Sequence, residues 1–448
     1  MSIISALFNS FGRQGSLQQR AVIGSIWTFG GYGGAQVVRF ASNLALTRLL
    51  APEYFGLMAL IMVLLIGLSM FSDLGIGPNI MQSDRAEDQS FLDTAFTLQF
   101  LRGVFLWVVC LIAAYPFAQF YHEPILAWLV PVVGLSVLIS GLSSTKLATA
   151  NRELNLGKLT MLELGAQAAT AIGTIAYAWF SPSVWALAFG TIFGTAIKVV
   201  ASLVLLPGRN NRFRWDPQAA SNLIHFGKWI FVGTILAFAS NSMGSLILGK
   251  LVSMTEVGIF SIAVTLSKVI EQAYEQLTQR VLLPVFIRIK DLPIAELRRR
   301  VMKVRLGAMA LFLPPLWIMV IFGQSIIALL FDKRYHSGGW ILQVFSAFSI
   351  FTILGGSRIF FLAKGNSFLM MNLSAVRLVS YLGCMLIGYQ FAGSNGVIIG
   401  MAGYIVPVYL IELYAQRSYN IAMPKVDICA IVLSATIILL GLKLTGGL

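Results

Sequence analysis

The sequence contains few charged residues, few cysteines and few histidines. Asp, Glu, Lys and Arg together make up 11% of its 448 residues, and cysteine and histidine occur three times each. Cys110, Cys384 and Cys429 lie singly in apolar segments, without the paired spacing of zinc or redox motifs. We therefore expect small core cysteines, no metal site and no cofactor.

Long apolar runs are what the sequence has in abundance. Hydrophobic residues make up 57% of the chain, in repeated stretches of about 20 residues, the length that crosses a bilayer core. No stretch shows the strict alternation of a membrane barrel strand. The pattern predicts an all-α polytopic membrane protein. The candidate spans lie at 22–46, 54–80, 93–119, 124–148, 158–180, 183–206, 223–248, 255–283, 303–328, 338–362, 366–391, 395–416 and 425–446.

Lysine and arginine are distributed unequally between the two sides of this topology. If the N-terminus is cytoplasmic, the inside segments hold 21 of these residues and the outside segments hold five. The positive-inside rule therefore predicts a cytoplasmic N-terminus. The asymmetry also accounts for much of the +14 net charge, so we expect membrane lipids as partners and no nucleic acid.

An internal repeat relates the two halves of the chain. A shift of 202 residues lays 24–56 on 226–258, and a shift of 212 aligns several later positions. Since each half then holds six spans, both copies have the same orientation, as in transporters built from parallel repeats. The matched pairs include Trp27 with Trp229, Arg48 with Lys250, Gly56 with Gly258, Trp128 with Trp340 and Lys146 with Arg358.

The repeat predicts two pseudo-symmetric six-helix lobes around a central cavity. We place the N-terminal lobe at residues 1–208, a cytoplasmic linker at 209–222 and the C-terminal lobe at 223–418. Residues 419–448 form an extra C-terminal helix in this scheme. The total is 12 to 14 transmembrane helices.

Five basic residues fall within the apolar spans. A charge at the centre of a membrane helix costs about 2.5–3.5 kcal/mol on insertion scales, unless it faces water or a partner. Arg102 and Lys198 lie near the cytoplasmic ends, where snorkelling of the side chain is a sufficient alternative. For the deeper residues we favour a cavity over a structural ion pair. The five are Arg39, Arg102, Lys198, Lys268 and Arg377.

Polar residues at helical spacing form two stripes that would line such a cavity. In the first span, Gln36, Arg39 and Asn43 share one face of the helix. In the eighth span, a longer stripe places Lys268 within one turn of Glu271. The amides of both stripes are candidates for binding sugars. The members of the second stripe are Lys268, Glu271, Gln272, Glu275 and Gln279.

Three carboxylates are candidates for coupling or gating. At the 202-residue offset, Glu275 aligns with Asp73, which gives each half one acidic group near its inner end. For Asp73 alone, a helix cap is the preferred alternative, because it precedes Gly75 and Gly77. For Lys268, Glu271 and Glu275 we consider a relay whose ion pairs change during transport, against a static pair that only assists membrane insertion.

Several segments resemble a known family of membrane exporters. NLALTRLLAPEYFGLMAL (43–60), FSDLGIGPNIMQ (71–82) and DTAFTLQFLRG (93–103) are similar to the polysaccharide-transport branch of the multidrug/oligosaccharidyl-lipid/polysaccharide exporter superfamily. The resemblance implies two six-helix lobes, a cationic cavity and a flippase of the bacterial cytoplasmic membrane. Its cargo would be a polyprenyl-diphosphate-linked oligosaccharide, moved outward by alternating access and coupled to an ion or to the membrane potential. Arg39 matches the family's cavity arginine by position.

Other functional classes fit less well. A multidrug or cation antiporter of the same superfamily would prefer an acidic or aromatic cavity, whereas this one is rich in Arg and Lys. A membrane-embedded glycan polymerase or ligase would need a larger outer loop with catalytic residues. We therefore expect no enzyme and no catalytic residue, although a polysaccharide polymerase is a candidate partner.

Overall fold

The computed structural model describes most of the chain. The described residues are 17–72, 75–83, 85, 87–153, 156–221, 223, 238, 243–289, 292–356, 358–364 and 366–444. Within these ranges the regular elements are helices, and no strand occurs. Seven candidate spans among them are long and apolar enough to cross a membrane. The expected all-α polytopic membrane fold is confirmed.

Contacts divide the chain into two compact units. The first contains Met1–Leu50 and Leu64–Ile235, and the second contains Ala51–Val63 and Leu236–Leu448. The division thus falls later in the sequence than the linker predicted at 209–222, and the first part of one helix belongs to the second unit. The predicted lobe boundaries themselves stay a prediction.

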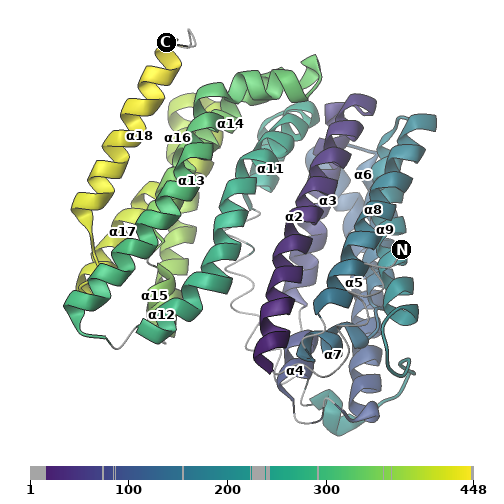
Figure 1. Ribbon diagram of the computed structural model, residues 1–448. Helices are drawn as coiled ribbons and strands as arrows, with labels where there is room; N and C mark the ends of the chain where they lie inside the picture. Colours follow the sequence, from purple (N-terminus) through teal and green to yellow (C-terminus); the bar gives the residue numbers. More distant parts are fainter. Residues whose placement is uncertain are drawn as a thin grey trace, which may run out of the picture. The chain divides into compact units, whose positions relative to one another are not determined.

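The first unit is a bundle of long helices with two short ones (Figure 1). Within it α2 packs on α8, α8 on α9, α5 on α6, and α6 on α9. Its helices are α2 (Leu17–Leu49), the end of α3 (Pro52–Phe71), α4 (Ile76–Gln82), α5 (Gln89–Tyr121), α6 (Leu126–Ser140), α7 (Lys146–Arg152), α8 (Leu156–Phe180) and α9 (Val184–Val204).

The second unit is also built of packed helices and ends with α18. Its main packing pairs are α13 with α14, α11 with α14, α16 with α17, and α13 with α18. Besides the start of α3, its elements are α11 (Met254–Leu277), the π-helix η1 (Thr278–Leu282), α12 (Leu283–Ile289), α13 (Ile294–Leu330), the 3-10 helix η2 (Lys333–Gly338), α14 (Gly339–Leu354), α15 (Arg358–Ala363), α16 (Ser367–Gly403), α17 (Ile405–Ser418) and α18 (Pro424–Leu444).

Two predicted spans meet at a turn inside the segment labelled α16 (Ser367–Gly403). The spans expected at 366–391 and 395–416 are separated there by Ala392, with φ −143°, and Gly393, with φ +56°. A Cβ on Gly388 would lie 2.0 Å from the carbonyl oxygen of Gly396, so the chain reverses direction at the turn and the two arms of α16 pack side by side. Glycine adopts positive φ without a steric penalty. The predicted boundary between the two spans therefore coincides with this turn, and α17 follows the second arm.

The internal repeat is visible in the helix boundaries. α2 ends at Leu49 and α3 begins at Pro52. In the second half a helix ends at residue 251 and α11 begins at Met254, so both boundaries recur after 202 residues. The short helices α7 and α15 begin at Lys146 and Arg358, which are 212 residues apart. The register of the repeat therefore holds for backbone structure as well as for sequence.

Two repeat-related glycines allow α3 and α11 to cross at close range within the second unit. A Cβ atom on Gly56 would lie 2.0 Å from the carbonyl oxygen of Met254, and one on Gly258 would lie 1.8 Å from that of Pro52. Gly56 and Gly258 are matched by the repeat, and so are Pro52 and Met254. Small residues give membrane helices this close backbone approach. The crossing is thus nearly symmetric, with each glycine facing the first turn of the other helix.

Substituting these glycines should destabilise the protein. We expect Gly56→Ala and Gly258→Ala each to lower the thermal midpoint of the detergent-purified protein, since overpacking typically costs about 1–3 kcal/mol. The matched control is Gly307→Ala in α13, where a Cβ would meet no atom within 4 Å. Alanine favours a helix over glycine by about 1 kcal/mol, so this variant should be unchanged or more stable. Equal midpoints for all three variants would contradict the close crossing.

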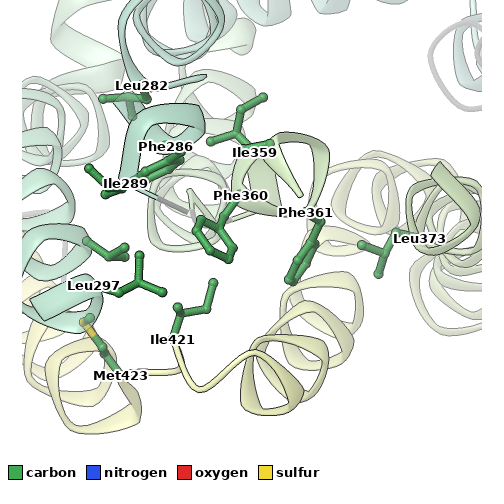
Figure 2. Packing of buried hydrophobic residues seen from close by; sticks show 12 residues of the cluster. Leu282, Phe286, Ile289, Leu297, Ile359, Phe360, Phe361, Leu373, Ile421 and Met423 are labelled. Atoms are coloured by element: carbon green, nitrogen blue, oxygen red, sulfur yellow. The ribbon is translucent and has the colours of Figure 1, made fainter. Parts of the chain in front are cut away.

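A compact apolar core joins the short helices of the second unit. Phe286 of α12 and Phe360 of α15 are fully buried, with their rings at 5.9 Å and nearly perpendicular. Ile421, in the connection between α17 and α18, is also fully buried in this cluster (Figure 2). Fully burying a large apolar side chain contributes about 1.5–3 kcal/mol. This core fixes the ends of α12, α13 and α15 around the start of α18.

In the first unit, the extended segment that follows α9 is fastened across the start of α5. The side chain of Asn211 accepts a hydrogen bond from the Thr145 amide at 3.0 Å and donates to the Thr145 hydroxyl at 2.7 Å. The amides of Arg214 and Asp216 donate to the hydroxyls of Thr97 and Thr94, each at 3.0 Å. The first part of the predicted linker is therefore held against the bundle.

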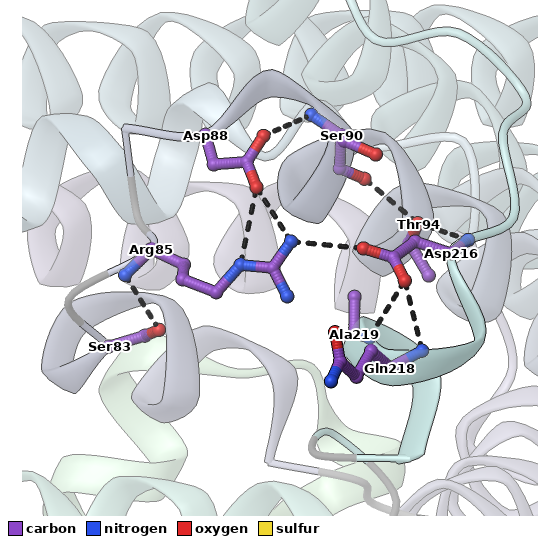
Figure 3. Close-up of polar contacts among 8 residues, drawn as sticks. All are labelled: Ser83, Arg85, Asp88, Ser90, Thr94, Asp216, Gln218 and Ala219. Carbon is purple, nitrogen blue, oxygen red and sulfur yellow. Dashed lines mark hydrogen bonds and ion pairs between the residues drawn. The ribbon is translucent and has the colours of Figure 1, made fainter.

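A small charge network completes this attachment (Figure 3). The Nη2 atom of Arg85 lies 2.7 Å from Asp88 and 2.9 Å from Asp216. Asp88 also caps α5 by accepting from the Ser90 amide. The Arg85 guanidinium holds the pKa of both carboxyl groups below their usual range. The ionised form of each carboxylate is therefore favoured in the folded protein.

The attachment should weaken in acid. A lowered carboxyl pKa contributes stability above the unfolded pKa of about 4, and this contribution is lost as the pH falls through the folded pKa. We expect hydrogen exchange of the Asp216 amide, corrected for intrinsic rate, to stay protected near neutral pH and lose protection below pH ~4. Asp216→Asn should reduce protection already at neutral pH. Asp332→Asn, which removes an exposed charge in the second unit, should behave as wild type; equal protection in both variants would contradict the prediction.

Candidate functional site

The polar stripe predicted in the eighth span lies on one continuous helix. α11 begins with a capping box in which the Ser253 hydroxyl accepts from the Glu256 amide and the Glu256 carboxylate accepts from the Ser253 amide. The stripe then follows the helix from Lys268 to Glu275 and reaches Gln279 in η1. Single π-helical turns widen a helix locally and often occur at functional sites. The stripe therefore ends where the backbone changes from α-helix to π-helix.

The second unit encloses a cavity of roughly 460 Å³ between α11, α14, α16 and α17. Six residues predicted from the sequence line this one cavity, including Arg377 from α16. Aromatic side chains cover much of the remaining wall. The six are Lys268, Glu271, Gln272, Glu275, Gln279 and Arg377, and the aromatic residues are Phe260, Tyr274, Phe345, Phe348, Phe351, Tyr381, Tyr404 and Tyr409.

Glu271 is held by hydroxyl groups rather than by the neighbouring lysine. Its Oε1 accepts hydrogen bonds from Ser349 at 2.6 Å and Thr352 at 3.3 Å, both on α14. Among the ion pairs of the described residues, none within 4.0 Å joins Lys268 to Glu271. Whether Lys268 and Glu271 pair at another stage of transport stays a prediction. Two hydroxyl donors from the neighbouring helix satisfy the carboxylate instead.

The two cavity cations are available to a ligand. Lys268 belongs to no ion pair between the described side chains. The Nε atom of Arg377 is buried and has no hydrogen-bond partner within the described part of the chain. A buried cationic donor of this kind is costly unless an anion or water completes its hydrogen bonds. Lys268 and Arg377 approach the same space from α11 and α16.

One lining residue was missed by the sequence analysis. Glu412 of α17 is only 4% exposed and contributes to the cavity wall. Its Oε2 lies 2.8 Å from where a Cβ on Gly355 would be, so the absence of a side chain at Gly355 makes room for it. The signal was present, since Glu412 is an acidic residue inside the predicted span 395–416.

The candidate residues of the first unit lie on α2. Arg39 is exposed, while Gln36 and Asn43 are partly buried, and the Gln36 amide donates to the Tyr32 hydroxyl at 2.8 Å. Gly31 of the GGYGG segment packs against Thr160 of α8, because a Cβ there would lie 2.1 Å from a side-chain atom. That glycine thus serves close helix packing. Arg39 stays a candidate ligand by position.

The remaining intramembrane charges have local partners. Arg102 donates through Nε to the Ser72 hydroxyl and through Nη2 to the Ser69 carbonyl, near the end of α3. A cation at a helix C-terminus is favourable, which gives Arg102 a structural role. Lys198 lies 3.7 Å from Glu163, and both side chains are largely exposed. Asp73 lies outside the described residues.

Comparison with known proteins identifies the family. The profile of a family described as "Polysaccharide biosynthesis protein" matches residues 45–338. The chain belongs to this family. The match covers well over half of the sequence and extends from α2 to the 3-10 helix η2.

Two curated relatives agree with the family. The chain is 23% identical over 399 residues to the lipopolysaccharide biosynthesis protein WzxC of Escherichia coli, covering 86% of this chain and 78% of WzxC. It is 21% identical to the teichuronic acid biosynthesis protein TuaB of Bacillus subtilis, covering 66% of this chain and 61% of TuaB. The resemblance to the polysaccharide-transport branch is confirmed.

Solved structures show the same fold in transporters. An inward-facing multidrug resistance MATE family transporter of the MOP superfamily matches with a TM-score of 0.68, at 14% identity, over 87% of this chain and 96% of that one. The Vibrio cholerae MATE transporter VcmN in its bent form matches with a TM-score of 0.52, also at 14% identity, over 90% of this chain and its full length. This member of the polysaccharide biosynthesis family therefore has a transporter fold.

Proposed function

We propose that the protein is a flippase for polyprenyl-diphosphate-linked oligosaccharides. The observation that carries this proposal is the cavity of the second unit, where Lys268 and Arg377 stand among aromatic and amide side chains. Arginine and lysine bind phosphate oxygens through charge-assisted hydrogen bonds. Aromatic rings and amides suit the faces and hydroxyls of sugars. The cargo would be a repeat unit of a surface polysaccharide, moved from the inner to the outer leaflet.

The biological setting of the proposal follows the relatives. WzxC and TuaB are named for the biosynthesis of lipopolysaccharide and teichuronic acid, which supports a glycan as cargo. We place the protein in the bacterial cytoplasmic membrane, with a cytoplasmic N-terminus, on the basis of its charge asymmetry. A polysaccharide polymerase that consumes the exported unit is a candidate partner. Alternating access would expose the cavity to one side at a time.

The second candidate function is a multidrug or cation antiporter. Three carboxylates support it, because Glu271, Glu275 and Glu412 all line the cavity and acidic groups attract cationic drugs. The two candidates differ in the sign of the charge that each requires for substrate binding. A flippase depends on Lys268 and Arg377, whereas a drug antiporter depends on the carboxylates.

Removal of the cavity cations should abolish export. We expect Arg377→Ala and Lys268→Ala to cause accumulation of lipid-linked oligosaccharide, since a hydrogen bond to a charged group is worth about 1.5–3 kcal/mol, or roughly 10- to 100-fold in affinity. Arg39→Ala tests the position implied by the family. Arg377→Lys should rescue export partly, because a point charge keeps the attraction but loses bidentate geometry.

The control for this experiment is Lys198→Ala, which removes an exposed, ion-paired lysine of the first unit. It should export normally. Membrane protein levels are measured by immunoblot, so that lost export is not confused with lost protein. Full export by both Arg377→Ala and Lys268→Ala, together with resistance to cationic drugs that depends on the carboxylates, would favour the antiporter.

We further propose that the α11 carboxylates couple transport to the proton gradient. Incoming phosphate would bind Lys268 and change the electrostatic environment of Glu271 and Glu275, and a carboxylate in a site of lowered dielectric favours its protonated form. The alternative is a static role in helix packing. In the proposed role, Glu271 would exchange its hydroxyl donors on α14 for another partner as the cavity opens.

Neutral variants separate these two roles. Glu271→Gln and Glu275→Gln keep side-chain shape, and the amide carbonyl introduced by Glu271→Gln would still accept hydrogen bonds from Ser349 and Thr352. We expect substrate binding to persist while transport into vesicles becomes insensitive to an imposed pH gradient. Glu163→Gln, on the exposed surface of α8, should keep the wild-type gradient dependence. Coupling would have to reside elsewhere if both α11 variants also kept it.

A further inference from the structure

A basic and aromatic segment lies on the surface of the first unit, after α9. Residues 209–215 contain no helical turn. From position 212 onward, arginine alternates with an aromatic residue, and the two aromatic side chains are 62% and 52% exposed. Exposed apolar surface of this kind often marks an interaction site. The exposed members of the segment are Arg209, Arg212, Phe213, Arg214 and Trp215.

Backbone hydrogen bonds hold the segment in place. The Arg212 amide donates to the Asp93 carboxylate at 3.1 Å, and the Arg214 amide donates to the Thr97 hydroxyl at 3.0 Å. The same hydroxyl lies 2.9 Å from the Arg214 carbonyl. Because these bonds use main-chain atoms of the segment, they do not occupy its side chains. The exposed side chains therefore project from a fixed backbone.

The segment crosses α5 where an apolar stripe of that helix begins. Thr97 is followed on the same face by exposed apolar residues at helical spacing, and the ring of Phe213 lies 5.2 Å from that of Phe100. Since α5 is a candidate membrane span, we expect this exposed stripe to face lipid tails. The segment would then lie at the boundary between lipid tails and water. The stripe consists of Leu101, Phe105, Val108 and Ile112.

The positive charges of the segment are not neutralised by the protein. Among the described residues, its arginine side chains belong to no ion pair. The two carboxylates that adjoin the segment have other donors. Asp216 pairs with Arg85, and Asp93 accepts from a main-chain amide. Three fixed positive charges therefore remain available to an external anion.

We propose that residues 209–215 bind the anionic phospholipid surface of the membrane that the protein spans. The three arginines would contact headgroup phosphates, and each basic residue near an anionic surface strengthens binding roughly fivefold. Trp215 would lie at headgroup level, where tryptophan is enriched because its ring is apolar and its N–H is polar. The stripe of α5 favours lipid over a soluble partner, because it continues from the segment along a candidate membrane span. The proposal is independent of the transported cargo.

The test follows the fluorescence of Trp215 in the full-length protein, reconstituted in lipid nanodiscs. The difference between wild type and Trp215→Phe isolates this one tryptophan. Lipids brominated near the headgroup, phosphatidylglycerol or phosphatidylcholine at equal mole fraction, serve as contact quenchers. We expect the Trp215 signal to be quenched more strongly by the brominated phosphatidylglycerol, since the arginines enrich anionic lipid beside it, and only weakly by acrylamide in the water phase.

Charge variants test the role of the arginines, each measured with and without Trp215→Phe. Arg209→Gln, Arg212→Gln and Arg214→Gln together should abolish the preference for phosphatidylglycerol. The thermal midpoint should be unchanged, because the altered side chains are exposed and the backbone bonds remain. The corresponding triple lysine variant should keep the preference, since a lipid surface requires positive charge rather than a guanidinium.

The matched control removes three positive charges from the second unit instead. Its substitutions on exposed residues of α13 should leave the Trp215 signal as in wild type. Quenching by acrylamide but by neither lipid would overturn the proposal, and so would equal quenching by both lipids or a preference that survives the triple glutamine variant. Since transport is not measured, these outcomes leave the flippase proposal to its own experiment. The control substitutions are Arg298→Gln, Arg299→Gln and Lys303→Gln.

Discussion

The cost of placing charge in a medium of low dielectric is the constraint on which the arrangement of this protein depends. Arg102 offsets this cost by donating hydrogen bonds to Ser69 and Ser72 at the end of α3. The buried Lys146 offsets it by donating to the carbonyls of Leu203 and Leu206, and Arg305 does so by pairing with Asp427. Lys268 and Arg377 differ from these residues because they face a cavity. The same physical rule thus separates structural charges from candidate ligand-binding charges.

Close packing of backbones replaces the hydrophobic effect as the main association force between these helices. Lipid tails are as apolar as leucine, so contact area and small residues matter more than burial from water. Gly56 of α3 with Gly258 of α11, and Gly388 with Gly396 on the two arms of α16, bring backbones together where any side chain would clash. These contacts position α11 and α16, the two helices that contribute the cavity cations. The glycines therefore support the site without taking part in it.

The cavity combines features that a purely cationic site would lack. Its lysine and arginine favour an anionic group, while three carboxylates and a set of aromatic rings surround them. A transporter that moves a charged head group needs binding that can be reversed, and nearby opposite charges provide competing partners for the cations. The MATE structures share the fold at 14% identity, so the side chains of this cavity, rather than the fold, carry the argument for a glycan-diphosphate cargo.

The sequence by itself determined the membrane class, the helical architecture, the repeat and the polar stripe of α11, because these depend on composition and on periodicity along one helix. Only the tertiary structure decided which distant residues meet. Arg377 shares a cavity with the stripe, Glu271 bonds to Ser349 and Thr352 of α14, and Arg305 of α13 bonds to Asp427 of α18. Such contacts depend on how several helices pack, and no local pattern encodes the distance between residues on different helices.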